Sequence, residues 1–525
     1  MISLAPGTKV CLACRSVIFD RWAHLTRVLA LLGHYDRRKL PLSGRTTMAV
    51  LRRSANSSRT GRAYAITTMM RTRLSRTLFI PSVGKERAVE RVVQTEQFEG
   101  SSVPDCDVLV IGGGPGGSTI AALLAQRGRR VILVDKDQHP RFHIGESLLP
   151  LNLPLFDRLG VREEIENTAI HKYGVEFVSP YHGKSVTYDF ARAWDKRFPY
   201  AFQVRRSTFD NILLKNAATK GATVIQGCRV TAVEFPDQGD PQVEGRDEEG
   251  NVRRWTATFV VDASGRNALL ASRFGLKERN PKNNSAAIFG HFTGARRLPG
   301  KAEGNISIVW FEHGWFWFIP LADGTTSVGA VCPAQFLKDR GADLNSFFMS
   351  VIASCPEIAD RLKAAELCGP VTATGNYSYK SSRASGRNYI LVGDAYAFID
   401  PVFSTGVYLA MIAAFRGADT IEACQRNPRR AERELRRYDE ATRNALSAFT
   451  WFIYRVREPA MRNLFMSPRN VFRVEEAVLA LLAGDIFVGW SVRARIYLFG
   501  TIYYIVKLGQ LRHRLGAIRR TPATS

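Results

Sequence analysis

The sequence predicts an α/β (α+β) fold that combines a Rossmann-like dinucleotide-binding domain, a mainly antiparallel β-sheet domain and a C-terminal helical region. Three observations carry this prediction: a glycine-rich turn between an apolar strand and a helix, a second strand that ends in an acidic side chain, and an aromatic strand near residue 315. The chain has 525 residues, of which 45% are hydrophobic, so it is long enough to build several domains around a large core.

The glycine-rich turn stands in the full context of a dinucleotide site. Residues 107–111 (DVLVI) form a short apolar strand, and the turn GGGPGG that follows opens a helix over 118–127. Gly112 permits the tight turn, Gly114 lets a pyrophosphate approach the backbone, and Gly117 lets the helix pack close to the strand. The order strand, turn and helix makes this motif far more specific than the glycine pattern alone.

Three later segments extend this site. A second strand at 130–134 ends in Asp135, at the offset where an acidic side chain binds a ribose hydroxyl. A strand and turn follow at 259–265, and another strand at 387–393 ends in Asp394. In flavoproteins of the hydroxylase type such a Gly-Asp pair closes the flavin site from the far side, which favours FAD over NAD. The alternative for Asp394 is a helix cap, and one aspartate can do both.

The aromatic strand is the most distinctive segment of the chain. Residues 314–320 read GWFWFIP, and strand alternation places Trp315 and Trp317 on one face and Phe316 and Phe318 on the other. An isolated run of this kind is most often a core strand that is buried on both faces. Its functional meaning therefore depends on the other motifs.

Taken together, these motifs resemble those of an FAD-dependent halogenase of the flavin monooxygenase superfamily, over about 107–415 and more loosely beyond. The match includes HPRFHIGES at 139–147, the W-x-W-x-I-P segment, and DPVFSTG at 400–406. The resemblance implies FAD, used as FADH2 with O2 and with chloride or bromide. In that family a halide attacks a flavin C4a-hydroperoxide and gives hypohalous acid, while the protein holds the halide and guides the electrophile.

The resemblance also implies the catalytic groups. It places the catalytic lysine at Lys172, which would hydrogen-bond hypohalous acid or carry the halogen as a haloamine; a desolvated ammonium has a lowered pKa that suits either role. Without the resemblance, a solvated surface lysine would be the preferred interpretation. Trp315 and Trp317 would separate flavin from substrate, and Thr405 and Gly406 would bind the halide at a turn that leads into a helix.

Cofactor contacts are implied by the same resemblance. Arg205 lies where family members place an arginine near the flavin, and a generic ion pair is an equal alternative for this residue. The other expected cofactor contacts are Gly112, Gly114, Gly117, Asp135, Arg141, Ser147, Val230, Asp394, Gly406 and Val407.

One departure from the tryptophan halogenases concerns the substrate. Those enzymes carry a glutamate in a Pro-Leu-Glu-Ser-Thr-Gly segment, where this chain has Phe403, which cannot act as a base. The substitution points to a phenolic or pyrrolic ring, either free or tethered to a carrier protein. No second nucleotide fingerprint is visible, so a separate NAD(P)H-dependent flavin reductase is expected. The alternative activities are a flavin-dependent aromatic hydroxylase, a geranylgeranyl-reductase-like prenyl reductase and, less favoured, a non-enzymatic flavoprotein.

The charge of +25 is distributed unevenly along the chain. Residues 1–76 hold 15 Lys or Arg against two acidic residues, a net +13, and this Arg-rich composition is typical of a transit peptide or a disordered tail. Met48, Met69 and Met70 offer later starts, and a chain that begins at Met69 is expected to keep activity. The eight cysteines are scattered, and the pair Cys11 and Cys14 has no partner motif, so we expect no metal and a reducing cytoplasm.

The order of the motifs predicts the domain organisation. We expect a basic disordered extension, a discontinuous FAD-binding domain, a substrate-binding sheet domain and a helical cap, with these bounds: 1–103; 104–170, 205–275 and 370–425; 171–204 and 276–369; 426–525. Charge runs in the cap are usually solvated faces. Docking of an acidic carrier protein is one alternative for them, and contact with a membrane surface is a less favoured one. No nucleic-acid motif accompanies the charge.

Overall fold

The computed structural model describes residues 103–525 except for 281–283, 339–340, 342, 376–377, 487–488 and 521–525, and it describes the helix 513–520 without its side chains. The expectations for the N-terminal extension, including the later start sites and the pair Cys11 and Cys14, lie outside the described residues. Val103–Ser525 form a single unit.

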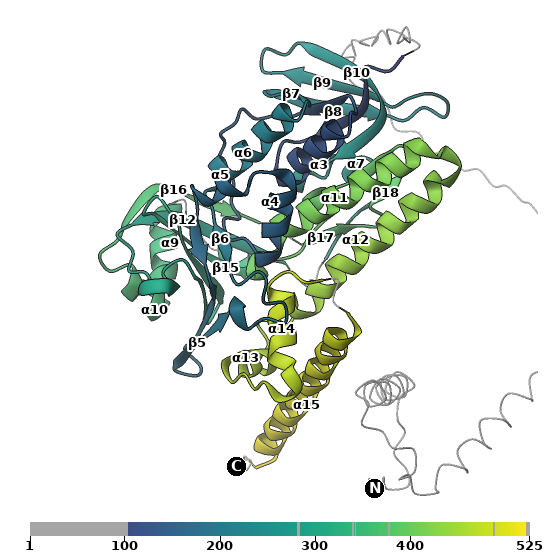
Figure 1. Ribbon diagram of the computed structural model, residues 1–525. Coiled ribbons are helices and arrows are strands. Elements are labelled where there is room, and N and C mark those ends of the chain that lie inside the picture. Colours follow the sequence, from purple (N-terminus) through teal and green to yellow (C-terminus); the bar gives the residue numbers. More distant parts are fainter. Residues whose placement is uncertain are drawn as a thin grey trace, which may run out of the picture. The chain divides into compact units, whose positions relative to one another are not determined.

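The first sheet is mainly parallel, with strand order β18-β19-β10-β1-β2-β7 (Figure 1). Its central strands are short apolar runs that are buried on both faces, as a covered parallel sheet requires. The long strand β10 runs parallel to β1 and β19 in its second half and pairs antiparallel with β9 in its first half. The bounds are β1 Cys106–Ile111, β2 Val131–Val134, β7 Thr223–Ile225, β8 Cys228–Glu234, β9 Gln242–Asp247, β10 Val252–Asp262, β18 Ser385–Gly386 and β19 Tyr389–Leu391.

Helices from distant parts of the sequence pack beside this sheet. The helix α3, which begins inside the glycine-rich turn, packs against both α6 and α11, and α11 packs against α12. The smaller helices α4 and α5 join this layer through contacts with α3 and α6 (Figure 1), whereas α7 contacts the short helix η8 (Gly393–Ala395). The bounds are α3 Pro115–Gln126, α4 Leu153–Leu159, α5 Arg162–Glu166, α6 Arg206–Thr219, α7 Leu269–Arg273, α11 Thr405–Arg426 and α12 Ala431–Ile453. The predicted Rossmann-like α/β architecture is confirmed.

The second sheet has the order β16-β12-β15-β14-β13-β4-β5 and is antiparallel except for the pair β4 and β13. The helices α8, α9 and α10 border it. The bounds are β4 Gly174–Ser179, β5 Lys184–Asp189, β12 Ser285–Thr293, β13 Ile306–Phe311, β14 Gly314–Pro320, β15 Thr326–Pro333, β16 Glu366–Thr374, α8 Ala334–Lys338, α9 Leu344–Ala353 and α10 Pro356–Arg361. The predicted antiparallel sheet is thus present, and the expected domain boundary at 370 falls inside β16. The division of the chain into domains stays a prediction.

The aromatic strand is β14, and its alternation is as predicted. Trp315 and Trp317 enter the large core that is shared with the first sheet and the C-terminal helices. Phe316 and Phe318 enter a separate core that contains side chains of α9 and α10. The strand is therefore buried on both faces, and each face belongs to a different core.

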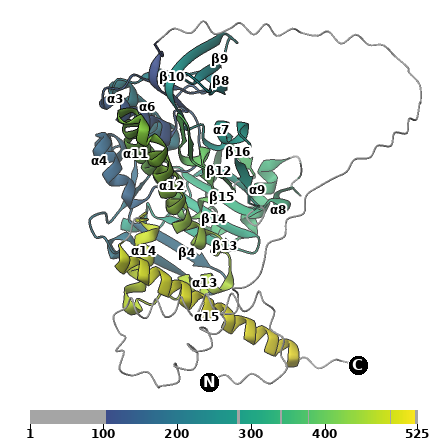
Figure 2. The same cartoon turned by 90° about the vertical axis from the view of Figure 1, so that its right-hand side faces the viewer.

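The C-terminal region is helical, as predicted, with α13 Pro459–Met466, α14 Val474–Leu482 and α15 Trp490–Arg520. The helix α13 contacts β4 and β5 of the second sheet as well as α15 (Figure 2). Its side chains join the large core, so this region is packed onto the rest of the described chain. None of the described helices combines the length and the apolar character that crossing a bilayer would require.

Candidate active site

Three glycines of the glycine-rich turn meet different geometric demands. Gly112 has a φ of +103°, and a Cβ there would lie 2.4 Å from the carbonyl oxygen of Ala263. A Cβ on Gly117 would lie 1.8 Å from the carbonyl oxygen of Gly112, because α3 approaches β1 closely. A Cβ on Gly114 would have only one atom of the protein within 4 Å, Nη2 of Arg141 at 3.7 Å. Two glycines are therefore required by the fold, while the space at Gly114 is open.

Unused hydrogen-bond donors surround that open space. The helix α3 begins after Gly114 with no side-chain cap and no acidic residue in its first turn, so its N-terminal N–H groups keep their positive partial charge. Arg141 Nη1 lies 3.3 Å from a carboxylate oxygen of Asp210, yet it is buried without a hydrogen-bond partner. Donors beside a backbone that carries no Cβ fit the pyrophosphate of a dinucleotide.

Asp135 interacts with the glycine-rich turn itself. Its carboxylate accepts hydrogen bonds from the N–H groups of Gly113 and Asp137. Burial favours the neutral form, but the His139 ring 3.6 Å away and the hydrogen bonds from the N–H groups of Asp137 and Gly113 outweigh it, so the pKa of Asp135 lies below its ordinary value. The carboxylate is thus held ionised at the end of β2, the position predicted for a ribose contact.

Asp394 lies beside the same turn although it is far away in the sequence. It comes after β19, in the short helix η8 (Gly393–Ala395). The start of α3 packs against the end of β19, since a Cβ on Gly116 would lie 2.8 Å from Cγ1 of Val392. Burial raises the pKa of Asp394 to about 6. The structure therefore brings together the glycine-rich turn and the predicted far wall of the flavin site.

Lys172 is buried rather than solvated. It ends β3 (Ile170–Lys172), which pairs with β6 (Ala201–Gln203), and its side chain is among the largest that are fully buried. Its Nζ donates to Oγ of Ser147 at 2.9 Å and to the carbonyl oxygen of Leu148 at 3.0 Å, and it lies 5.3 Å from the ring centroid of Phe190. Burial lowers the pKa of Lys172 to about 7. Among the described residues no carboxylate forms a salt bridge with it.

Ser147, which we expected to contact the cofactor, therefore hydrogen-bonds the candidate catalytic lysine. It also forms an isolated β-bridge with Gln203, the last residue of the strand β6 that pairs with β3. The preceding residue, Glu146, is buried and accepts a hydrogen bond from the ring of His291 at 2.7 Å. The HPRFHIGES loop is thus tied both to Lys172 and to the second sheet.

A series of packed aromatic rings connects the tryptophan strand with the expected halide turn. Trp315 is paired with Trp310 on β13. Consecutive ring centroids then lie 5.4, 4.9 and 6.4 Å apart along the series Trp310, Phe177, Phe465 and Phe403. Phe465 comes from α13, so the C-terminal region forms part of this aromatic wall. The indole N–H groups of Trp310 and Trp315 are buried without a hydrogen-bond partner. Unpaired buried donors are rare in native proteins, so these two call for an explanation.

The expected halide turn leads into the long helix α11. The carboxylate of Asp400 accepts a hydrogen bond from the N–H of Val402, and Ser404 adopts a left-handed conformation with a φ of 55°. The helix starts at Thr405 with no side-chain cap and no acidic residue in its first turn. A Cβ on Gly406 would meet no atom within 4 Å. Free N–H groups beside open space make this helix end suitable for an anion.

Two expected cofactor residues have other contacts in the structure. Arg205 makes an ion pair with Asp323 and a hydrogen bond to the hydroxyl of Thr325, in the turn between β14 and β15. Val230 is buried in β8 and paired with Gly245 on β9. The contacts of Arg205 are those of the ion-pair alternative. A role for either residue in holding the cofactor stays a prediction, as it does for Val407, which is buried in the first turn of α11.

Sequence reasoning missed Trp310, Phe465 and the pair formed by Glu146 and His291. Trp310 lies at the end of the apolar run 306–311, and its pairing with a recognised tryptophan strand is the signal that would have found it. The contact of Phe465 with Phe403 joins residues that are far apart in the sequence, so no local sequence pattern predicts it.

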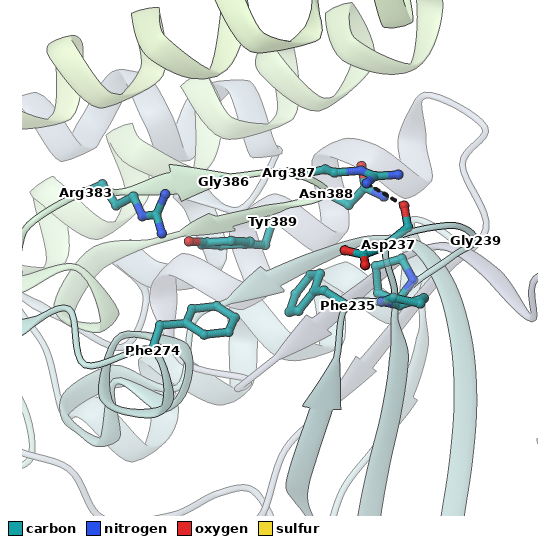
Figure 3. A pocket seen from close by; sticks show the side chains of 11 residues that line it. Phe235, Asp237, Gly239, Phe274, Arg383, Gly386, Arg387, Asn388 and Tyr389 are labelled. Atoms are coloured by element: carbon teal, nitrogen blue, oxygen red, sulfur yellow. Dashed lines mark hydrogen bonds between the residues drawn. The ribbon is translucent and has the colours of Figure 1, made fainter. Parts of the chain in front are cut away.

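A cavity of about 290 Å³ lies elsewhere on the first sheet (Figure 3). Its walls include Phe235, Phe274 and Tyr389, whose rings pack on one another with centroids 5.3 to 5.8 Å apart. Tyr389 begins β19, whereas Asp394 and the glycine-rich turn lie at the opposite, carboxyl end of the sheet. This cavity is therefore separate from the candidate active site.

A glycine-rich turn near the end of β19, joined to a second sheet that carries paired tryptophans, is the arrangement expected of an FAD-dependent enzyme of the flavin monooxygenase type. The chain belongs to the tryptophan halogenase family, since the family model described as Tryptophan halogenase matches residues 107–196 and 182–456. It is a flavin-dependent halogenase that uses FAD, and this assignment confirms the predicted activity over the hydroxylase, prenyl-reductase and non-enzymatic alternatives.

Curated relatives and solved structures agree with this assignment. A 1H-pyrrole-2-carbonyl-[peptidyl-carrier protein] chlorinase of Pseudomonas fluorescens is 33% identical over 409 residues, which cover 73% of this chain and 90% of that protein. A tryptophan 2-halogenase of Chondromyces crocatus is 36% identical over 324 residues, covering 60% of this chain and 61% of that protein. The structure of the myxobacterial chondrochloren halogenase, a variant of FAD-dependent halogenases, matches with a TM-score of 0.65 and 31% identity over 75% of this chain and 97% of that one.

Proposed function

We propose that this halogenase delivers hypohalous acid through Lys172 to an activated ring, phenolic or pyrrolic. The observation that carries the proposal is the environment of the lysine. Its amine is fully buried, hydrogen-bonds only neutral oxygens and has a pKa of about 7, so both the amine and the ammonium are populated near neutral pH. A structural lysine would instead be expected to pair with a carboxylate or to reach solvent.

The other groups of the chain have one task each. Bound reduced FAD and O2 supply the oxidising equivalent that turns chloride or bromide into hypohalous acid. The free N–H groups at the start of α11, at Thr405 and Gly406, would hold the halide. Arg141 and the N-terminus of α3 would hold the pyrophosphate. Lys172 would then position the hypohalous acid by a hydrogen bond or bind the halogen on its amine nitrogen.

The tryptophan strand would act as a barrier that keeps the organic substrate away from the flavin. Trp315 and Trp317 present two large rings, with centroids 6.1 Å apart, on the side of β14 that faces the large core. Trp317 is fixed by a hydrogen bond from its Nε1 to Oγ of Ser327. A rigid wall of this kind would let only the small hypohalous acid pass.

The substrate class is inferred from Phe403 and from one relative. Phe403 occupies the position of the glutamate in tryptophan halogenases, and its ring stacks on Phe465 at an interplanar angle of 18°. The pyrrole-specific relative acts on a ring that is bound to a peptidyl carrier protein. These observations support an activated ring, free or tethered to a carrier, over free tryptophan. Reduced FAD would come from a separate NAD(P)H-dependent reductase.

Mass spectrometry of candidate substrates tests this proposal. The enzyme would be incubated with reduced FAD, O2 and either chloride or bromide, together with a phenol, a pyrrole-2-carbonyl carrier protein or free tryptophan. We expect a halogen isotope pattern on a phenolic or pyrrolic ring and an unmodified tryptophan. Halogenated tryptophan, with the activated rings untouched, would refute the proposed substrate class but not the assignment as a halogenase.

Opening the barrier should uncouple the reaction. We expect Trp315→Ala to bind FAD but to release more hydrogen peroxide for each halogenated product, because the wall between flavin and substrate becomes incomplete. The cavity costs about 3–5 kcal/mol of stability, so Phe316→Ala on the opposite face of β14 is the matched control. Peroxide release and product are measured together. Equal coupling in both variants would mean that Trp315 serves only to pack the core.

A further inference from the structure

The helix α15 carries an apolar stripe on the side that faces away from the core. Five large side chains of this helix are exposed by 41 to 68%: Trp490, Tyr497, Ile505, Leu508 and Leu511. At about 100° per residue their positions fall along one side of the helix, over a length of about 30 Å at 1.5 Å per residue. We call these five residues the α15 stripe.

The opposite side of α15 fixes the direction in which the stripe points. Phe499 and Tyr503 are buried in the large core, and the ring of Phe499 stacks on Phe452 of α12 with centroids 5.5 Å apart. The hydroxyl of Tyr503 donates to the carboxylate of Glu458 at the start of α13. Figure 2 shows the C-terminal half of α15 extending past α13 and α14. The stripe is therefore held outward by packing on its other side.

The helix that carries the stripe is strongly basic. Its 31 residues include seven Lys or Arg and no Asp or Glu. Arg493, Lys507 and Arg512 are exposed beside the stripe, and of these Lys507 is paired with Glu458. An apolar stripe between cationic side chains complements a surface that is apolar inside and anionic outside.

We propose that the α15 stripe binds this halogenase to an anionic lipid surface, with the helix lying along the membrane. Trp and Tyr at one end, aliphatic side chains at the other and flanking Arg and Lys are the features of an interfacial helix. The buried side of α15 belongs to the protein core, so only the stripe is available to lipid. Five side chains on one helix are also few compared with the roughly 20–30 residues per partner in a standard protein interface.

The charge of α15 argues against two other occupants. Residues 1–76 of the same chain carry a net charge of +13, which has the same sign as the charge of this helix and therefore does not complement it. A second copy that docked its own stripe here would bring two helices of seven cationic residues and no acidic residue together. An anionic lipid surface meets neither obstacle.

Co-sedimentation with lipid vesicles tests the proposal on the full chain. We expect the protein to sediment with vesicles of phosphatidylcholine containing a quarter phosphatidylglycerol, and to stay in solution with pure phosphatidylcholine. The double substitution Ile505→Glu and Leu508→Glu should reduce the bound fraction at least tenfold, because it puts charge into the stripe. Met349→Glu, at an exposed apolar residue of α9 that lies outside the stripe, is the matched control and should bind like the unchanged protein.

The design separates the stripe from other causes of binding. All variants keep residues 1–76, so vesicle binding that survives the double substitution would come from this basic segment or from another part of the chain outside the stripe, and it would overturn the proposal. A dimer in solution that the double substitution converts into a monomer, without vesicle binding, would overturn it in favour of a second copy. Halogenation and the melting temperature of the double variant should match those of Met349→Glu, which shows that the fold and the active site are intact.

Discussion

Replacing Lys172 with methionine is expected to stop the transfer of halogen to the substrate, lowering the rate by on the order of 10³-fold or more, because none of the other lysines that the structure describes occupies this position. FAD binding and the consumption of reduced FAD should remain, since the side chain contacts Ser147, Leu148 and Phe190 rather than the glycine-rich turn. Methionine preserves the length of the buried side chain and removes only the amine. Halogenated product at the unchanged rate would exclude Lys172 from the reaction.

The pH dependence gives this prediction a second readout. Burial holds the pKa of Lys172 at about 7, so the neutral amine predominates above that pH. If the amine binds the halogen, the rate of halogenation should rise as the pH increases through 7 and then level off. A rate that falls above pH 7 would instead show that the ammonium acts by donating a hydrogen bond. Either profile should vanish in Lys172→Arg, whose guanidinium does not titrate in this range.

The stability of the fold should also depend on pH because of this buried amine, and the direction of that dependence can be predicted. The pKa of Lys172 is lowered from its ordinary 10.5, so below pH 7 the fold carries the full cost of holding the ammonium in a buried site. As the pH rises from about 7 to about 10.5, the unfolded chain binds more protons than the folded one, and this cost disappears. Between pH 7 and 10 the melting temperature of the native protein should therefore rise relative to that of Lys172→Met. A constant difference would mean that the amine is not desolvated.

Local signals in the sequence predicted the parts of this molecule that local rules determine. The strand, turn and helix around Gly114 are determined by the glycine spacing, and the two faces of β14 by the alternation of Trp315, Phe316, Trp317 and Phe318. Both depend on neighbours within a few residues. The same kind of reasoning identified the helical character of the C-terminal region, though not the partners of its helices.

Contacts between distant segments were beyond local reasoning. By composition alone Lys172 is a surface lysine, and only the tertiary structure shows that strand pairing buries it beside Ser147. The stack of Phe465 on Phe403 depends on how α13 packs against the second sheet. Arg205 has its partner, Asp323, in a turn more than a hundred residues later. Such pairs are decided by the packing of whole elements, which no short window of sequence contains.

A substitution in the glycine-rich turn should also have a large effect, in this case on FAD binding. We expect Gly114→Ala to leave the apoprotein folded and to weaken FAD binding about 100-fold, which corresponds to roughly 3 kcal/mol. The new methyl group would lie 3.7 Å from Nη2 of Arg141, an ordinary contact, so the protein itself has room for it. That room is the space that a pyrophosphate would occupy against the backbone and the N-terminus of α3. Flavin absorbance after gel filtration and a titration of the apoprotein with FAD would measure the loss.

Gly117→Ala is the informative comparison because the same methyl group has a different effect there. Its Cβ would lie 1.8 Å from the carbonyl oxygen of Gly112, so α3 must move away from β1 and the apoprotein itself should lose several kcal/mol of stability. If Gly114→Ala lowers the melting temperature of the apoprotein as much as Gly117→Ala does, the open space at Gly114 is not a ligand site. If Gly114→Ala binds FAD with unchanged affinity, the pyrophosphate lies elsewhere. A folded apoprotein that has lost only its affinity for FAD would locate the pyrophosphate at the N-terminus of α3.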